Sequence, residues 1–235
     1  MNGPRPGRLW VVAGTGTDVG KTWSACALAR EVRARGLVVA ARKPAQSFDP
    51  AAAGAGGGEL DADLLARATG ELPEQVCRPG RCYEVAMAPP MAAAALGRPP
   101  VRLADLVDEL AWPPGTDVGL VEQAGGLGSP QAEDGDGVDM VAALRPDGVL
   151  LVSRPGLGAL GDIGLARRAL SATGAGTGRF VVLLNRFERS DPVQVANLRW
   201  LAAHGAQAFT TVSDVAAHLL GASPGGVAGG AAPEG

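Results

Sequence analysis

Short apolar runs alternate along the chain with segments in which apolar residues recur at helical spacing. Each run spans five or six residues, the length expected of a strand that is buried on both faces. Strands that alternate with helices are typical of parallel sheets with helical crossover connections. The expected strands cover Leu9 to Ala13, Leu37 to Ala41, Val118 to Glu122, Gly148 to Ser153, Phe180 to Asn185 and Ala206 to Thr211.

Helical periodicity fills the segments between these runs. The expected helices cover Lys21 to Arg35, Asp61 to Ala68, Leu103 to Leu110, Val138 to Leu144, Leu160 to Ala172 and Pro192 to His204. Gly36 is placed to end the first helix. The residues predicted to form the buried face of that helix are Trp23, Ala27, Leu28 and Val32. The pattern predicts an α/β fold, a doubly wound, mainly parallel sheet with helices on both faces.

A single domain over residues 1–220 is expected, because 235 residues with 46% hydrophobic side chains can form a substantial core. The Gly- and Ala-rich segment from Ala51 to Gly58 is expected to be a mobile loop. Residues 221–235 are a Gly/Ala/Pro tail that we expect to be disordered, since it has little apolar surface to bury.

Composition and charge exclude several classes of partner. A formal net charge of −3 leaves no broad basic surface for nucleic acid. Neither a membrane-spanning run nor a secretory signal is recognisable, so we expect a cytoplasmic protein without a membrane partner. Neither zinc binding nor a disulfide is expected, because the cysteines lack CxxC spacing and the histidines lack partners at ligand spacing. These residues are Cys26, Cys77, Cys82, His204 and His218.

The segment from Gly14 to Thr22 reads Gly-Thr-Gly-Thr-Asp-Val-Gly-Lys-Thr, between the first expected strand and the first expected helix. In such a loop, backbone N–H groups converge on phosphate oxygens, Lys21 reaches the terminal phosphates and the Thr22 hydroxyl can bind Mg²⁺. The first glycine lies six rather than five residues before Gly20, so the loop is a longer variant of the general pattern. A chance Gly-Lys-Thr among 35 glycines is the alternative explanation.

Polar residues follow the carboxyl ends of three further strands, where ligands of doubly wound sheets bind. Lys43 follows the second strand, Glu122 ends the third ahead of Gly125, and Asn185 ends the fifth. Taken singly, Lys43 is equally well explained as a solvated surface charge and Asn185 as a strand cap. Together they predict one polar site at this edge of the sheet.

Asp61 opens the helix that follows the Gly-rich segment. Aspartate is a common helix N-cap, so the capping role and a metal-binding role are both open. Mg²⁺ prefers carboxylate, hydroxyl and phosphate oxygens. Thr22, Asp61 and Glu122 therefore form a candidate Mg²⁺ site.

The order of these segments resembles the dethiobiotin synthetase family of the P-loop NTPase superfamily. The segments that carry the resemblance, over roughly residues 8–190, are GTGTDVGKT, KPAQS, LDADLLARATG, YEVAMAPPMAA, VEQAGGL, GLGAL and the strand that ends in Asn185. Partition ATPases with a similar loop carry a second lysine near the position of Gly16, and this chain has none there.

The resemblance implies an ATP-dependent cyclo-ligase of biotin biosynthesis. In that family 7,8-diaminononanoate takes up CO₂ as a carbamate, ATP phosphorylates the carbamate, and the second amine closes a cyclic urea. Mg²⁺, ATP as co-substrate and a homodimer are implied as well. The implied catalytic residues are Lys21, Lys43, Thr17 and Ser47. The implied nucleotide-binding residues are Gly16, Thr17, Asp18, Val19, Gly20, Lys21, Thr22, Glu122, Gly125 and Asn185, with Asn185 on the adenine. The implied metal ligands are Thr22, Asp61 and Glu122, and the implied substrate-binding residues are Lys43, Ser47, Gly156, Leu157 and Gly158.

Three departures from the family pattern bear on substrate and nucleotide choice. VEGAGG is VEQAGG here, so Gln123 is expected to narrow or reshape the pocket. GLGTLNH is GLGALGD, which puts Asp162 beside the expected substrate carboxylate. The C-terminal Gly-x-x-Pro element is replaced by the segment from Ala208 to Val212. Two alternatives stay open: a paralogue with the same chemistry on another small amine, and a non-catalytic nucleotide-dependent switch.

Overall fold

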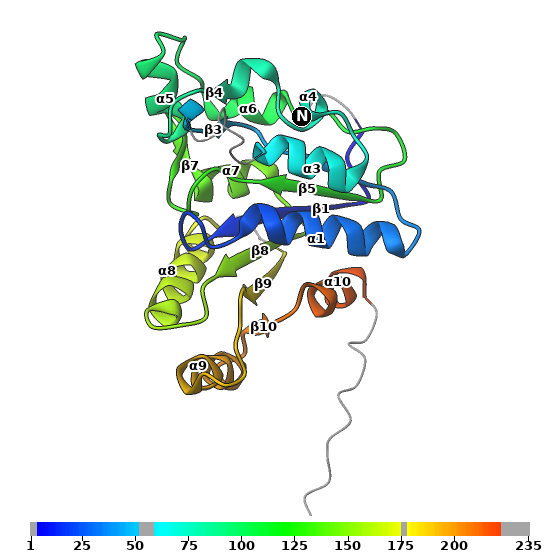
Figure 1. Cartoon of the computed structure of the whole chain (residues 1–235), viewed down its shortest axis with the longest axis vertical. Coiled ribbons are helices and arrows are strands. Elements are labelled where there is room, and N and C mark those ends of the chain that lie inside the picture. The colour runs from blue at the N-terminus through cyan, green and yellow to red at the C-terminus, as the bar shows by residue number, and fades with distance from the viewer. Residues whose placement is uncertain (1–3, 52–58, 175–177, 222–235) are drawn as a thin grey trace, which may run out of the picture.

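The computed structural model of the protein describes residues 4–51, 59–174 and 178–221 (Figure 1). The loop expected between Ala51 and Gly58 and the tail expected after residue 220 lie outside the described residues, apart from Ala51 and Gly221. The division into one domain and a disordered tail therefore stays a prediction.

Within the described residues, six parallel strands form the central sheet in the order β10-β9-β8-β1-β5-β2. These strands are β1 (Arg8–Gly14), β2 (Val39–Arg42), β5 (Val118–Glu122), β8 (Gly148–Ser153), β9 (Arg179–Leu184) and β10 (Gln207–Phe209). Each lies where the apolar runs predict a strand, so the α/β class and the parallel sheet are confirmed.

Helices cover both faces of the sheet (Figure 1). On one face lie α1 (Lys21–Ala34), α3 (Asp61–Thr69), α4 (Pro73–Val76) and α10 (Val212–Leu220). On the other lie α6 (Leu103–Asp108), α7 (Gly137–Leu144), α8 (Ala159–Ala172) and α9 (Pro192–Ala203). Along β1, Trp10 and Val12 enter the first core, whereas Val11 enters the second, because successive strand residues point to opposite faces. All six expected helices are confirmed.

Trp23 does not lie on the buried face of α1, and its expected place in the core was wrong. Its side chain is 60% exposed, whereas Leu28 and Val32 are buried. Trp23 stands in the first turn of the helix, and the neighbouring residues Ser24 and Ala25 are buried in its place. The spacing of apolar residues alone predicted that α1 has a buried face, but not which residues of its first turn lie on that face.

Several short elements beyond the carboxyl end of β2 were not predicted. They are β3 (Gln46–Ser47), a 3₁₀ turn (Pro79–Arg81), β4 (Cys82–Tyr83), α5 (Pro89–Ala95), β6 (Pro130–Ala132) and β7 (Gly135–Asp136). The helices α4 and α10 were not predicted either. Strands of two or three residues are too short to show a period. In α5 two prolines occupy the first positions, where a missing N–H costs nothing. No helix in the described part of the chain is long and apolar enough to cross a membrane.

Candidate nucleotide and substrate site

A cavity of about 760 Å³ opens at the carboxyl ends of the parallel strands. Because β1 lies between β5 and β8, the loop after β1 is flanked by residues that follow both of those strands. The lining residues are Thr17, Asp18, Gly20, Lys21, Thr22, Trp23, Lys43, Gln46, Ser47, Asp61, Ala86, Met87, Ala88, Pro89, Glu122, Ala124, Gly125, Ser129, Arg154 and Arg186. The structure thus brings most of the predicted site residues into one cavity.

The loop between β1 and α1 has the backbone geometry of a phosphate-binding loop. Gly20 has a φ of 94°, a left-handed conformation that favours glycine, and α1 begins at the next residue. A Cβ on Gly14 would lie 2.9 Å from the Gly16 carbonyl oxygen, so the turn leaves no room for a side chain there. Lys21 Nζ donates a hydrogen bond to that same oxygen at 3.1 Å. The loop therefore stands folded with its lysine directed into the cavity.

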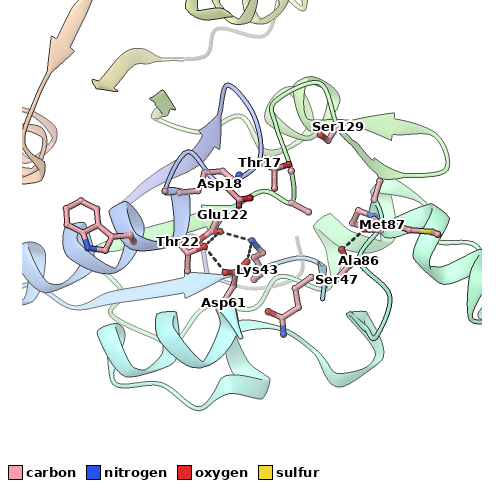
Figure 2. Close-up of a pocket in the computed structure, with 18 of the residues that line it drawn as sticks. Thr17, Asp18, Thr22, Lys43, Ser47, Asp61, Ala86, Met87, Glu122 and Ser129 are labelled. Atoms are coloured by element: carbon pink, nitrogen blue, oxygen red, sulfur yellow. Dashed lines mark hydrogen bonds and ion pairs between the residues drawn. The ribbon is translucent and has the colours of Figure 1, made fainter. Parts of the chain in front are cut away.

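Lys43 joins two carboxylates at the centre of the cavity (Figure 2). Its ammonium nitrogen lies 2.6 Å from Glu122 Oε1 and 2.8 Å from Asp61 Oδ2. Thr22 Oγ1 lies 2.7 Å from Glu122 Oε1 and 2.8 Å from Asp61 Oδ1, and it donates its one proton to one of these oxygens. The prediction that Lys43 is more than a surface charge agrees with its exposed fraction of 3%.

The pKa values of the two lysines shift in opposite directions. Burial disfavours the Lys43 ammonium, but the carboxylates of Glu122 and Asp61 outweigh it and raise the pKa of Lys43 above its usual value. For Lys21, burial and the nearby Lys43 charge lower the pKa despite the same two carboxylates. Lys43 is therefore held as a cation, and the Lys21 ammonium forms no ion pair with a carboxylate of the described residues.

The oxygens around Thr22 fit a hard divalent cation such as Mg²⁺. Glu122 is 1% exposed, and its Oε2 has no hydrogen-bond partner within the described residues. A buried carboxylate oxygen without a partner is costly unless a cation or ligand satisfies it. No cluster of three or more His, Cys, Asp or Glu residues suited to a metal occurs in the described ranges. Mg²⁺ commonly takes one or two carboxylates and completes its shell with phosphate and water.

Ser47 lies on the far side of the cavity from the phosphate-binding loop. Its hydroxyl donates to the Met87 carbonyl oxygen, and both residues line the cavity (Figure 2). Ser47 belongs to β3, which is paired with β4, and the segment that leads from β4 to α5 forms this wall. Ser47, a predicted substrate contact, thus faces the cavity from the wall opposite the phosphate-binding loop.

Two arginines in the cavity lining were missed by the sequence analysis. Arg154 follows β8 and Arg186 follows Asn185 at the end of β9. Neither side chain has a hydrogen bond or ion pair to another described residue, so both guanidinium groups are available to an anion. The same strand-end rule that singled out Asn185 would have found them, had it been applied to the next residue along.

Asn185 lies behind the phosphate-binding loop and does not line the cavity. It is 6% exposed, and its Nδ2 donates to the Val19 carbonyl oxygen at 2.8 Å. Gly20 passes so close that a Cβ would lie 2.1 Å from Asn185 Nδ2. The amide thereby braces the loop, and its predicted contact with adenine stays a prediction. Gly16 and Val19 likewise lie in the loop but outside the lining.

Replacing Asn185 with alanine is expected to lower the free energy of unfolding by about 1–3 kcal/mol, because the buried Val19 carbonyl loses its partner. Denaturant titration measures the change, and ATP affinity should fall with it as the loop loosens. Stability and ATP affinity equal to those of the parent protein would contradict the bracing role.

Gln123 does not narrow the cavity, and that expectation was wrong. Its side chain is fully buried, and its Nε2 donates to the Gly137 carbonyl oxygen at 2.6 Å, at the start of α7. Glu122 and Gln123 are consecutive, so they point to opposite faces of the sheet, and only Glu122 faces the cavity.

Residues Gly156 to Gly158 lie outside this cavity, in the loop ahead of α8. Asn197 holds the loop by donating to the carbonyl oxygens of Pro155 and Gly156 at 2.8 and 2.9 Å. Leu157 is 93% exposed. Asp162 is exposed in the first turn of α8, and a Cβ on Gly158 would lie 4.0 Å from its Oδ2. The predicted substrate-carboxylate loop and the cavity are therefore separate in one chain.

Trp23 provides an optical probe of this cavity, because it lines the cavity and is exposed. Adding ATP is expected to change the tryptophan emission of the protein, since a bound ligand displaces water from the indole. The change should disappear in Trp23→Phe and persist in Trp200→Phe, whose indole is also exposed but lies on α9 outside the lining. An ATP-dependent change that survives in Trp23→Phe would place the nucleotide elsewhere.

The parallel sheet, the loop ahead of α1 and the lysine and carboxylates around it define a P-loop nucleotide-binding protein. Residues 8–217 match a family model described as an AAA domain. The ATP-dependent dethiobiotin synthetase BioD of Caulobacter vibrioides (strain NA1000 / CB15N) is 39% identical over 175 residues, which cover 73% of this chain and 77% of that protein. The protein of the same name from Rhodococcus jostii (strain RHA1) is 41% identical over 168 residues, covering 71% and 69%. The chain belongs to the ATP-dependent dethiobiotin synthetase family, whose members are ATP-dependent ligases.

Solved structures give a more distant likeness. The signal recognition particle 54 kDa protein of Aeropyrum pernix K1 in complex with GDP has a TM-score of 0.46 and 16% sequence identity, covering 89% of this chain and 43% of that one. The signal recognition particle receptor FtsY of Elizabethkingia anophelis has a TM-score of 0.45 and 16% identity, covering 83% and 55%. The chain thus spans about half the length of these structures.

Proposed function

We propose that this protein is a Mg-ATP-dependent dethiobiotin synthetase that carboxylates 7,8-diaminononanoate and closes the ring. The observation that carries the proposal is the place of Lys43, which stands with Glu122, Asp61 and Thr22 between the phosphate-binding loop and the wall that contains Ser47. A nucleotide switch has no need of a buried lysine on the substrate side. The family membership supports the same reaction.

The proposed reaction has three steps. An uncharged amine of the substrate attacks the carbon of CO₂ and loses a proton, which forms a carbamate. A carbamate oxygen attacks the γ-phosphorus of ATP, and ADP leaves. The second amine then attacks the carbonyl carbon of this mixed anhydride, phosphate leaves with the bridging oxygen, and a cyclic urea is formed.

Lys43 and Lys21 would act on the negative charge in these steps. The Lys43 ammonium, which its two carboxylates keep protonated, would bind the carbamate. Lys21, at the start of α1, would bind the γ-phosphate and stabilise the charge that grows on it during transfer. Thr17 and Ser47 would donate hydrogen bonds to the phosphates and to the carbamate from the two walls. Gly125 lines the cavity with a φ of 63°, and its neighbour Gly126 packs against the loop, where a Cβ would lie 3.1 Å from Gly16 Cα.

Thr22, Asp61 and Glu122 would hold Mg²⁺, with the unpaired Glu122 Oε2 as one of its ligands. When bound, Mg²⁺ offsets the mutual repulsion of the phosphate oxygens. Lys43 occupies the space between Glu122 and Asp61 in the structure described here. Lys43 contacts Oε1 of Glu122, so Oε2 would be left for the metal while the ammonium binds the carbamate.

A homodimer belongs to the proposal. Gly156, Leu157 and Gly158 do not line the cavity of their own chain, and Leu157 is 93% exposed. We propose that the backbone N–H groups of this loop bind the substrate carboxylate in the site of a second copy. A negative charge at Asp162 would then disfavour an acidic substrate tail if it lay within about 8–10 Å. Light scattering during gel filtration tests the dimer.

The experiment that tests the proposed function measures ADP formation with Mg-ATP, bicarbonate and a panel of diamines. ADP release that depends on 7,8-diaminononanoate, with formation of the cyclic urea, supports the proposal. Turnover only with another diamine favours the paralogue that Asp162 suggests. ATP binding, read from Trp23 fluorescence, without turnover on any amine favours a switch.

A further inference from the structure

Two thiols that the proposed reaction does not use lie side by side next to the site. Cys77 follows α4 and Cys82 begins β4, and their sulfur atoms are 3.6 Å apart. Cys77 is buried, whereas Cys82 is partly exposed. A disulfide has a sulfur-sulfur distance of about 2.05 Å, so closing the pair moves the sulfurs together by about 1.5 Å. The spacing in the sequence did not suggest this proximity.

The environment of Cys82 favours its thiolate. Gln46 Nε2 donates to Cys82 Sγ at 3.2 Å, and Arg98 donates to the Cys82 carbonyl oxygen at 2.8 Å. A hydrogen bond from Cys77, the bond from Gln46 and the Arg98 charge lower the pKa of Cys82 to about 6, against the effects of burial and of Asp63. The same pairing raises the pKa of Cys77. Cys82 is thus the nucleophile of the pair and Cys77 the protonated partner.

The thiol pair is attached to the cavity at three points. The Lys43 N–H donates to the carbonyl oxygen of Val76, the residue before Cys77, at 2.8 Å. Cys82 is paired with Gln46 in the β3–β4 ladder, and Ser47 is the next residue of β3 (Figure 1). The Gln46 Oε1 accepts from the N–H of Ala62, the residue after Asp61, at 3.0 Å. The backbone segments that contain Lys43, Ser47 and Asp61 are therefore all linked to the segments that contain Cys77 and Cys82.

We propose that Cys77 and Cys82 are a redox modification site that forms an intrachain disulfide with a peroxide, and that the disulfide lowers the activity of the neighbouring site. The disulfide itself is independent of the function proposed above. Its effect on turnover rests on that function.

The chemistry balances with hydrogen peroxide as the oxidant. The Cys82 thiolate attacks one peroxide oxygen, the O–O bond breaks, and hydroxide leaves and is protonated to water, which gives a sulfenic acid on Cys82. The Cys77 thiol loses its proton and attacks the Cys82 sulfur, and the sulfenic oxygen leaves as a second water. Two thiols are oxidised by two electrons, and the peroxide is reduced to two waters.

Closing the pair draws the end of α4 toward β4 and displaces the segment from Lys43 to Ser47, which is hydrogen-bonded to Val76 at the end of α4 and paired with β4. Displacing catalytic groups by about 1 Å can cost on the order of 100-fold in rate. We expect the oxidised protein to turn over about 10- to 100-fold more slowly, and a dithiol reductant to restore the rate.

The test treats the full chain with hydrogen peroxide and follows both the intact mass and the peptides that carry each cysteine. The expected result is the loss of two hydrogen masses and a linked Cys77–Cys82 peptide, absent in Cys77→Ala and Cys82→Ala. Cys26→Ala is the matched control and should still form the link, because Cys26 is buried in α1 and burial raises its thiol pKa to about 11. In the parent protein, alkylation of Cys82 by iodoacetamide should fall as pH drops through about 6, and in Cys77→Ala the fall should come at a higher pH, because the hydrogen bond from Cys77 is lost.

Two results would overturn the proposal. One is that both cysteines still carry free thiols after peroxide treatment. The other is a Cys77–Cys82 disulfide that leaves both turnover and ATP-dependent Trp23 emission unchanged. If the parent protein proves inactive on every amine, the linked peptide still reports on the modification site, so the two proposals fail separately.

Discussion

Replacing Lys43 with methionine is expected to lower kcat by about 10³-fold while ATP still binds. The ammonium lies 2.6 Å from Glu122 and 2.8 Å from Asp61 and would stabilise the carbamate and the phosphoryl group in transit. Removing one preorganised charge partner of a transition state costs roughly 10²–10³-fold. Steady-state ADP release gives kcat, and Trp23 emission gives ATP affinity in the same samples.

Arg42→Met is the matched control for this variant. Arg42 precedes Lys43, is about as buried, and pairs with Glu71 at 2.6 Å, but it lies outside the cavity lining. Both variants leave a buried carboxylate without its cation, so both should lose stability, on the order of 3–5 kcal/mol. Only Lys43→Met should lose kcat in the molecules that remain folded. Full activity in Lys43→Met would contradict the mechanism.

Glu122→Gln is expected to raise the Mg²⁺ concentration needed for half-maximal activity by at least about 100-fold. Losing a supporting partner of a metal ligand already costs 10–100-fold in metal affinity, and Glu122 would be a direct ligand. The substitution keeps the size of a side chain that is 1% exposed, so the packing around it should hold. Titration of ADP release with Mg²⁺ measures the shift.

Glu71→Gln serves as the control, since Glu71 is also a buried carboxylate paired with a cation but lies outside the cavity lining. Its Mg²⁺ dependence should match that of the parent protein. An unchanged Mg²⁺ requirement in Glu122→Gln would remove Glu122 from the metal site.

The strand ends were predictable because the carboxyl ends of parallel strands meet at one edge. Lys43 and Glu122, which are 79 residues apart in the chain, come together for that reason. Asp61 joins them from the start of α3, where its hydrogen bond to Thr22 could not be read from the sequence. The position of each residue along its strand or helix could thus be predicted from the sequence. The side chain that it contacts in the folded protein could not.

The failures share one physical cause, the direction of a side chain about its element. Gln123 points to the face opposite Glu122, and Trp23 leaves the core at the first turn of α1. Asn185 stands at the predicted strand end but turns toward Val19 behind the loop. The wall around Ser47 was missed because its strands are only two residues long and are held by long-range pairing.

The measurement that tests the central claim most directly follows oxygen from bicarbonate into phosphate. The protein is incubated with ¹⁸O-labelled bicarbonate, Mg-ATP and 7,8-diaminononanoate. The mass of the released phosphate is measured by mass spectrometry before the bicarbonate exchanges its label with water. Phosphorylation of a carbamate predicts one labelled oxygen in each phosphate, transferred when the mixed anhydride is cleaved, together with one cyclic urea. Unlabelled phosphate would show that water attacks ATP and would contradict the account.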